Sequence, residues 1–148
     1  MKRCNLIKRF FIGLLLIVVA SISANAQEGL YVKSIFQRFG HAKGCKMVTM
    51  QNTQPKGYRL KIYKSLVYKN HATEIAHYLK SDRKAAKKIR EVVENGKMVS
   101  GYYMMTPLSN GNNRFILFSN PSKSKGTVIY IEGNLSPEDI MQLCYSRR

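Results

Sequence analysis

Apolar and polar residues alternate with the two-residue period of a strand in some stretches of the chain and with a helical period in others. The clearest stretch is TVIYIEGNLSPEDIMQL, at residues 127–143. Its four consecutive apolar or aromatic residues at 128–131 predict a strand that is buried on both faces. Ser136 has the chemistry of a helix N-cap, and Pro137 suits the first helical position. This stretch predicts a buried strand followed by a capped helix that packs back onto the sheet.

The remaining patterns predict the other elements of the fold. Strand-like segments are expected at 45–51, 58–68, 97–108, 114–119 and 127–132. Helical spacing occupies residues 30–39 and 72–79, and it continues through 82–96 as a second segment or as part of one kinked helix. These elements predict an α+β fold with a mostly antiparallel sheet of four to five strands and two to four helices. The fold ends in a three-strand meander and a C-terminal helix.

Residues 1–26 have the order of a secretory signal peptide. Four basic residues precede an unbroken apolar core at 10–20, and the small-residue sequence ANA follows at 24–26. This core has eleven residues, whereas a bilayer span needs roughly 20, which disfavours an uncleaved membrane anchor. Cleavage before Gln27 would leave residues 27–148 as a single exported domain, periplasmic or secreted, with no transmembrane helix.

Export changes the meaning of the charge on the chain. The full sequence has 25 basic and 8 acidic residues and a formal net charge of +17. Removal of the four basic residues of the leader leaves +13 on the exported chain. In a cytosolic protein such a charge would point first to nucleic acid. Outside the cytoplasm the polyanions are lipid headgroups, phosphorylated glycolipids, cell-wall polymers and acidic glycans; alternatively, the charge only keeps the domain soluble.

The most distinctive chemical feature is a one-sided group of basic residues in the predicted helical region. On a helical wheel the group comprises Lys80, Arg83, Lys84, Lys87, Lys88 and Arg90. The opposite face carries Ala, Ile and Val, which suit packing on a sheet better than insertion into a membrane. The first five basic residues are therefore the candidate anion-binding residues. The alternative is an ordinary solvated helix face.

Two cysteines, Cys45 and Cys144, remain after removal of the leader. In an oxidising compartment they could form a disulfide, which would close a loop of about 100 residues and contribute about 4–5 kcal/mol. Their apolar surroundings favour two buried thiols instead.

No other motif points to catalysis or to a metal. His41, His71 and His77 lack the spacing of a metal site, and the chain has no HExxH, paired CxxC, GxSxG or phosphate-binding glycine motif. Aromatic and sulfur-containing residues on the predicted meander either form core or stack on a ligand from an open sheet face. They are Tyr102, Tyr103, Met104, Met105 and Tyr130. We therefore predict no catalytic residue, no metal and no cofactor.

The leader, the sequence KGCKMVTM after the first helix, and the closing run VIYIEGNLSPEDIMQL resemble small exported proteins of Bacteroidetes-type bacteria. These proteins are known only as domains of unknown function. The resemblance covers most of the exported chain and implies an α+β domain with no catalytic residues to carry over.

The sequence therefore favours a non-enzymatic exported binding or interaction module over an enzyme. Its partner would be an anionic glycolipid, a cell-wall polymer or another protein rather than nucleic acid. A cell-envelope hydrolase with a site assembled from distant residues is the first alternative, and a purely structural envelope component is the second.

Overall fold

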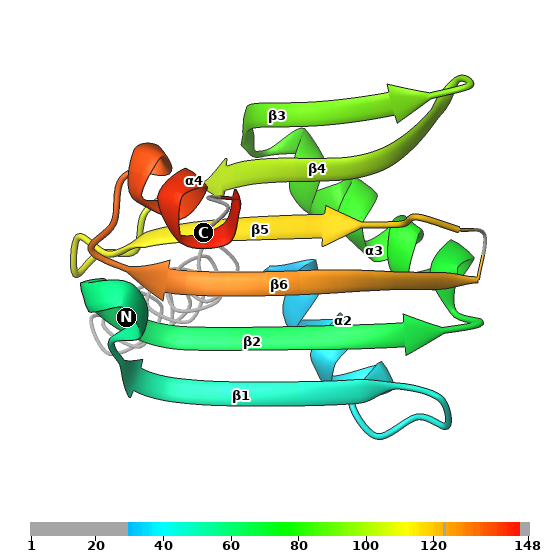
Figure 1. Cartoon of the computed structure of the whole chain (residues 1–148), viewed down its shortest axis with the longest axis horizontal. Coiled ribbons are helices and arrows are strands. Elements are labelled where there is room, and N and C mark those ends of the chain that lie inside the picture. The colour runs from blue at the N-terminus through cyan, green and yellow to red at the C-terminus, as the bar shows by residue number, and fades with distance from the viewer. Residues whose placement is uncertain (1–29, 123, 146–148) are drawn as a thin grey trace, which may run out of the picture.

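The computed structural model describes residues 30–122 and 124–145, which form an α+β fold built on one antiparallel sheet (Figure 1). The strands in these residues are β1 (Lys46–Thr53), β2 (Leu60–Lys69), β3 (Lys87–Glu94), β4 (Lys97–Met105), β5 (Asn113–Ser119) and β6 (Lys125–Gly133). The helices are α2 (Tyr31–Phe39), α3 (Ala72–Lys84) and α4 (Pro137–Tyr145), and η1 (Pro55–Gly57) is a short 3-10 turn. The predicted signal peptide and its cleavage site lie outside the described residues.

The six strands follow the order β1-β2-β6-β5-β4-β3, and every neighbouring pair is antiparallel. A hairpin joins β1 to β2, after which α3 carries the chain across one face of the sheet to the opposite edge (Figure 1). Strands β3 to β6 then return as a meander until β6 pairs with β2. The α+β class, the meander and the C-terminal helix were predicted correctly, whereas the sheet has six strands instead of four or five.

The additional strand is β3, and the predicted helix at 82–96 is wrong over most of its length. Helix α3 ends at Lys84, and β3 begins three residues later. The β-branched residues Ile89, Val92 and Val93 suit a strand. Asn95 and Gly96 both have positive φ and form the two-residue turn from β3 to β4. The Asn-Gly pair therefore closes a hairpin and does not end a helix.

The sheet is covered differently on its two faces. Helices α2 and α3 lie on the face that we call the two-helix face, and α4 lies on the other, which we call the α4 face (Figure 1). In β5 the side chains of Ile116 and Phe118 join the core under α2 and α3, whereas Phe115 and Leu117 join the core under α4. The central strand is thus buried on both faces.

Helix α4 begins with the predicted cap. The Asp139 backbone N–H donates to Ser136 Oγ at 3.1 Å, and the Ser136 N–H donates to Asp139 Oδ2 at 2.9 Å. This reciprocal pair is a capping box in which Asp takes the position usually held by Glu or Gln. The Tyr102 hydroxyl also donates to the Pro137 carbonyl at 2.9 Å, which joins the start of α4 to β4.

Helix α2 begins with a cap supplied from a distant part of the chain. The backbone N–H groups of Tyr31 and Val32 donate to the Asp82 carboxylate, at 2.9 and 2.7 Å. Sequence reasoning placed Asp82 at the start of a helix, but it lies near the end of α3. Burial raises the pKa of Asp82, and the two N–H donors lower it again in part. The carboxylate therefore ties α2 to α3.

Glu132, near the end of β6, is a second acidic residue inside the fold. It is buried, and its carboxylate accepts a hydrogen bond from the Tyr130 hydroxyl at 3.1 Å.

No helix among the described residues has both the length and the apolar character that crossing a membrane requires.

Candidate functional site

Most of the predicted anion-binding residues meet in one cleft between the end of α3 and strands β3 and β4. This basic cleft has a volume of about 340 Å³ and is lined by Lys80, Arg83, Lys84, Lys88, Glu91 and Tyr103. Helix α3 supplies the first three cations, and β3 supplies Lys88 and Glu91. Four of the five predicted residues thus share a site, although α3 ends at Lys84 and Lys88 lies on a strand instead of in the predicted helical region.

Lys87 does not line the basic cleft because β3 is a strand. It pairs with Met104, which packs against the α4-face core, whereas Lys88 pairs with Tyr103 of the two-helix-face core. Successive residues of a strand point to opposite faces. Lys87 and Lys88 are therefore neighbours in sequence that lie on opposite sides of the sheet. Lys87 is not part of the candidate site.

Arg83 forms the fixed part of the basic cleft. Its guanidinium carbon lies 5.8 Å from the centre of the Tyr103 ring and 6.0 Å from that of Phe118, both within cation–π range. Its Nε is buried and has no hydrogen-bond partner among the described residues. A buried donor without a partner costs free energy unless a ligand or water satisfies it. The contacts with the two rings thus hold the guanidinium in place, while its Nε–H donor remains without a partner among the described residues.

Glu91 is the carboxylate of the basic cleft, and its neighbours already engage it. Its Oε1 accepts a hydrogen bond from the Tyr103 hydroxyl at 2.5 Å, and Lys88 Nζ lies 3.5 Å from its Oε2. The hydrogen bond from Tyr103, and then the charges of Lys88 and Arg83, lower the pKa of Glu91. Four cations and one carboxylate leave three net positive charges in the cleft. Electrostatic binding of an anion is the chemistry that this arrangement offers.

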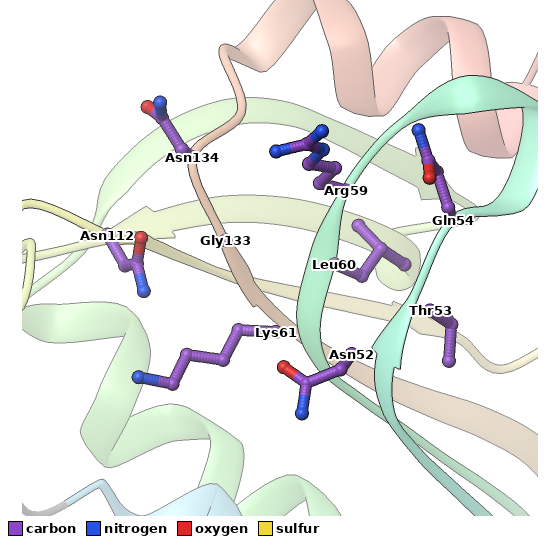
Figure 2. Close-up of a pocket in the computed structure, with 9 residues that line it drawn as sticks. All are labelled: Asn52, Thr53, Gln54, Arg59, Leu60, Lys61, Asn112, Gly133 and Asn134. Carbon is purple, nitrogen blue, oxygen red and sulfur yellow. The ribbon is translucent and has the colours of Figure 1, made fainter.

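A second and larger cleft lies at one end of the sheet, where β1 and β6 finish and β2 begins (Figure 2). This end cleft has a volume of about 530 Å³ and is lined by Asn52, Thr53, Gln54, Arg59, Leu60, Lys61, Asn112, Gly133 and Asn134. Most of these residues lie at or beside the ends of strands and are of types that are common in turns. The available signal was the recurrence of Asn and Gln beside the predicted strand ends, because these residues are suited both to turns and to hydrogen-bonding a ligand.

The candidate disulfide between Cys45 and Cys144 is not formed, and both cysteines are free. Cys45 is half-buried beside the two-helix-face core, whereas Cys144 lies on α4 and is exposed. The interpretation as two buried thiols therefore fails at Cys144. Although that residue is exposed overall, its apolar surroundings raise the pKa of its thiol, which disfavours the reactive thiolate.

The aromatic residues of the meander belong to the core. Tyr102, Tyr103 and Tyr130 are buried, as is Met105, so they offer no open stacking platform. Of the predicted histidines, His71 packs its ring on Phe39, with a centroid distance of 5.0 Å. Within residues 30–122 and 124–145, no group of three or more His, Cys, Asp or Glu residues is placed to hold a metal ion.

The comparisons with known proteins give one family. The model of a family of unknown function, DUF6108, matches residues 19–144. No curated protein and no solved structure matches the chain.

Proposed function

The chain belongs to the family of unknown function DUF6108, and we propose that it is an exported, non-enzymatic module that binds polyanions through the basic cleft. The observation that carries the proposal is the convergence of Lys80, Arg83, Lys84 and Lys88 around a single carboxylate. Anionic glycolipids and cell-wall polymers carry the repeated negative charges that such a cleft would bind. The order of charged, apolar and small residues in the leader supports export, as does the resemblance to exported proteins of Bacteroidetes-type bacteria.

The two kinds of cation in the cleft have different roles in this proposal. Lys80 and Lys84 take part in none of the ion pairs found among the described residues, so their ammonium groups are available to a ligand. They act as mobile point charges that attract anions with little regard to geometry. Arg83 is held by its ring contacts and presents a planar donor to a phosphate or carboxylate. Arg83 and Lys84 lie in the last turn of α3, where their positive charges interact favourably with the helix dipole and stabilise the helix.

The experiment compares two triple variants that remove the same charge. In the first, Lys80, Lys84 and Lys88 of the basic cleft are changed to Gln. In the matched control, the exposed lysines Lys46, Lys69 and Lys87, all outside the cleft, are changed to Gln. Binding to vesicles that contain an anionic phospholipid is measured by co-sedimentation at low and at physiological salt.

We expect the cleft variant to lose about 3 kcal/mol of binding free energy, at about 1 kcal/mol for each lysine near an anionic surface. The control variant should retain most of its binding, and the binding of the unmodified protein should weaken with salt. Equal losses in the two variants would show that only the net charge matters. Binding that none of these changes alters would remove the basic cleft from the proposal.

A further inference from the structure

We propose that the end cleft is a second binding site, separate from the basic cleft, and that it takes an acidic sugar: a polyhydroxylated ring that carries a carboxylate. Its lining contains four carboxamide side chains, one hydroxyl and two cations, and includes no carboxylate. The basic cleft has no carboxamide among its lining residues, so the two sites differ in chemistry. None of the residues that line one cleft lines the other.

The walls of the end cleft are fixed by close packing and hydrogen bonds. A side chain at Gly133 would bring its Cβ to 2.9 Å from the Arg59 carbonyl oxygen, so glycine allows the end of β6 to pass beside the start of β2. Asn113 Nδ2 donates to the Leu135 carbonyl at 2.7 Å, which attaches the segment after β6 to β5. Gln54 Nε2 donates to the Gly57 carbonyl at 3.3 Å and holds the loop after β1. The cleft is therefore preformed, which reduces the entropic cost of binding.

The polar groups of the end cleft come from separate parts of the chain. Figure 2 shows Arg59 and Lys61 extending from the start of β2, with Asn112 and Asn134 on the loops across from them. A carboxamide offers a donor and an acceptor side by side, and each hydroxyl of a sugar also donates and accepts. Amides on several sides of one space thus match a ring that carries hydroxyls around its edge.

Thr53 shows that part of this hydrogen-bonding capacity is unused. Its Oγ1 is buried and has no hydrogen-bond partner among the described residues. Such a group costs free energy until it is satisfied. Because the atom is buried, a ligand hydroxyl can donate to it and accept from it only after the Thr53 side chain turns its oxygen into the cleft. Leu60 contributes an apolar part of the lining, and its side chain is almost fully buried behind the polar groups.

Arg59 and Lys61 determine the charge of the ligand. Both are exposed, and neither takes part in an ion pair among residues 30–122 and 124–145. The acidic residue next to Gly133 in the chain, Glu132, is buried and accepts a hydrogen bond from Tyr130, and it does not line the cleft. Two positive charges without a carboxylate among the lining residues favour an anionic ligand, and an Arg guanidinium binds a carboxylate with two parallel hydrogen bonds.

The test uses the side-chain amide signals of the purified protein in two-dimensional NMR. Monomeric galacturonate, which carries a single charge and is not a polyanion for the basic cleft, is titrated into the protein, and neutral galactose and acetate are titrated in parallel at the same concentrations. We expect the uronate to shift the amide signals of Asn52, Gln54, Asn112 and Asn134 well beyond either control. Equal shifts with the neutral sugar would overturn the role assigned to the charge. Equal shifts with acetate, or none with any ligand, would overturn the assignment of a sugar site.

Variants then locate the site. Changing Arg59 and Lys61 together to Gln should weaken uronate binding by at least about tenfold, because the uronate loses its charge-assisted hydrogen bonds to these two side chains. The basic-cleft variant in which Lys80, Lys84 and Lys88 are changed to Gln serves as the control, and galacturonate should shift the end-cleft amide signals of this variant as it shifts those of the unmodified protein. Uronate affinity lost in the control and retained in the Arg59 and Lys61 variant would place the sugar in the basic cleft and refute this proposal. Vesicle binding by the basic cleft is measured separately, so either proposal can fail alone.

Discussion

The same six strands supply both faces of the sheet, but the two faces are covered unequally. The two-helix face is packed under α2 and α3, whereas the α4 face has one helix of nine residues. At its uncovered side, Val48 and Val67 are exposed by 41% and 51%. Val48 pairs with Ser65 on the α4 face, next to Tyr63, which packs on the α4-face core. The comparison shows that position in the sheet, and not the hydrophobicity of a strand alone, determines which side chains are buried.

The unequal covering also determines where ligands can reach the sheet. The basic cleft opens where α3 ends on the two-helix face, next to the edge strand β3. The end cleft opens where β1 and β6 finish and β2 begins. In both places a regular element ends and leaves polar side chains that no further layer covers.

The largest effects should come from the central strand, where neighbouring residues test the two faces. Ile116 packs under α2 and α3, and Leu117 packs on the α4-face core; both are buried. Ile116→Ala and Leu117→Ala should each lower the free energy of unfolding by about 2–5 kcal/mol. The Ile116 cost should be the larger, because two helices restrict relaxation around the cavity. Urea denaturation measures both values, and an unchanged midpoint for either variant would show that its face is loosely packed.

The second-largest effect should be a loss of stability at alkaline pH that originates on the two-helix face. Burial raises the pKa of Tyr68 on that face to about 12. A phenol whose folded pKa exceeds its unfolded value of about 10 stabilises the protein fully below pH 10. That stabilisation, roughly 3 kcal/mol for a shift of two pH units, is lost as pH rises through 10 towards 12. Urea denaturation between pH 9 and pH 11.5 should show the loss.

Tyr68→Phe provides the control for the alkaline effect. This variant cannot ionise at position 68, so the decline of its stability above pH 10 should be shallower than that of the unmodified protein. It also loses the hydrogen bond from the Tyr68 hydroxyl to Asn120, so its stability near pH 7 should be lower. Identical pH slopes for the two proteins would mean that Tyr68 is not the group responsible.

Local patterns predicted the parts of the fold that depend on neighbouring residues. The closing strand and capped helix at 127–143 formed as expected because Ser136 and Asp139 are three residues apart and complete each other's hydrogen bonds. The segment 87–94 was misassigned because its apolar residues fit both periods and because Asn95-Gly96 can end a helix or close a hairpin. Pairing with β4, a tertiary interaction, decided in favour of the strand.

The two clefts were predictable to different degrees. Four cations of the basic cleft were identified because charge clusters remain visible along the sequence, although the helical wheel wrongly included Lys87. The end cleft was not identified because its residues come from four separate places in the chain, which only the strand order brings together. The cap that Asp82 provides for α2 spans 50 residues and was invisible for the same reason.

The smallest effects should come from the two helix caps. The cap on the two-helix face comes from a residue distant in the sequence, whereas the cap of α4 comes from a neighbouring residue. Asp82→Ala leaves two N–H groups at the start of α2 without their charged acceptor and should cost about 2 kcal/mol. Ser136→Ala removes one local acceptor at the start of α4 and should cost about 1 kcal/mol. Because Asp82 joins α2 to α3, its loss should also increase amide hydrogen exchange in both helices, whereas loss of Ser136 should affect α4 alone. Equal exchange in α2 and α3 before and after the Asp82 change would show that packing alone holds the two-helix face together.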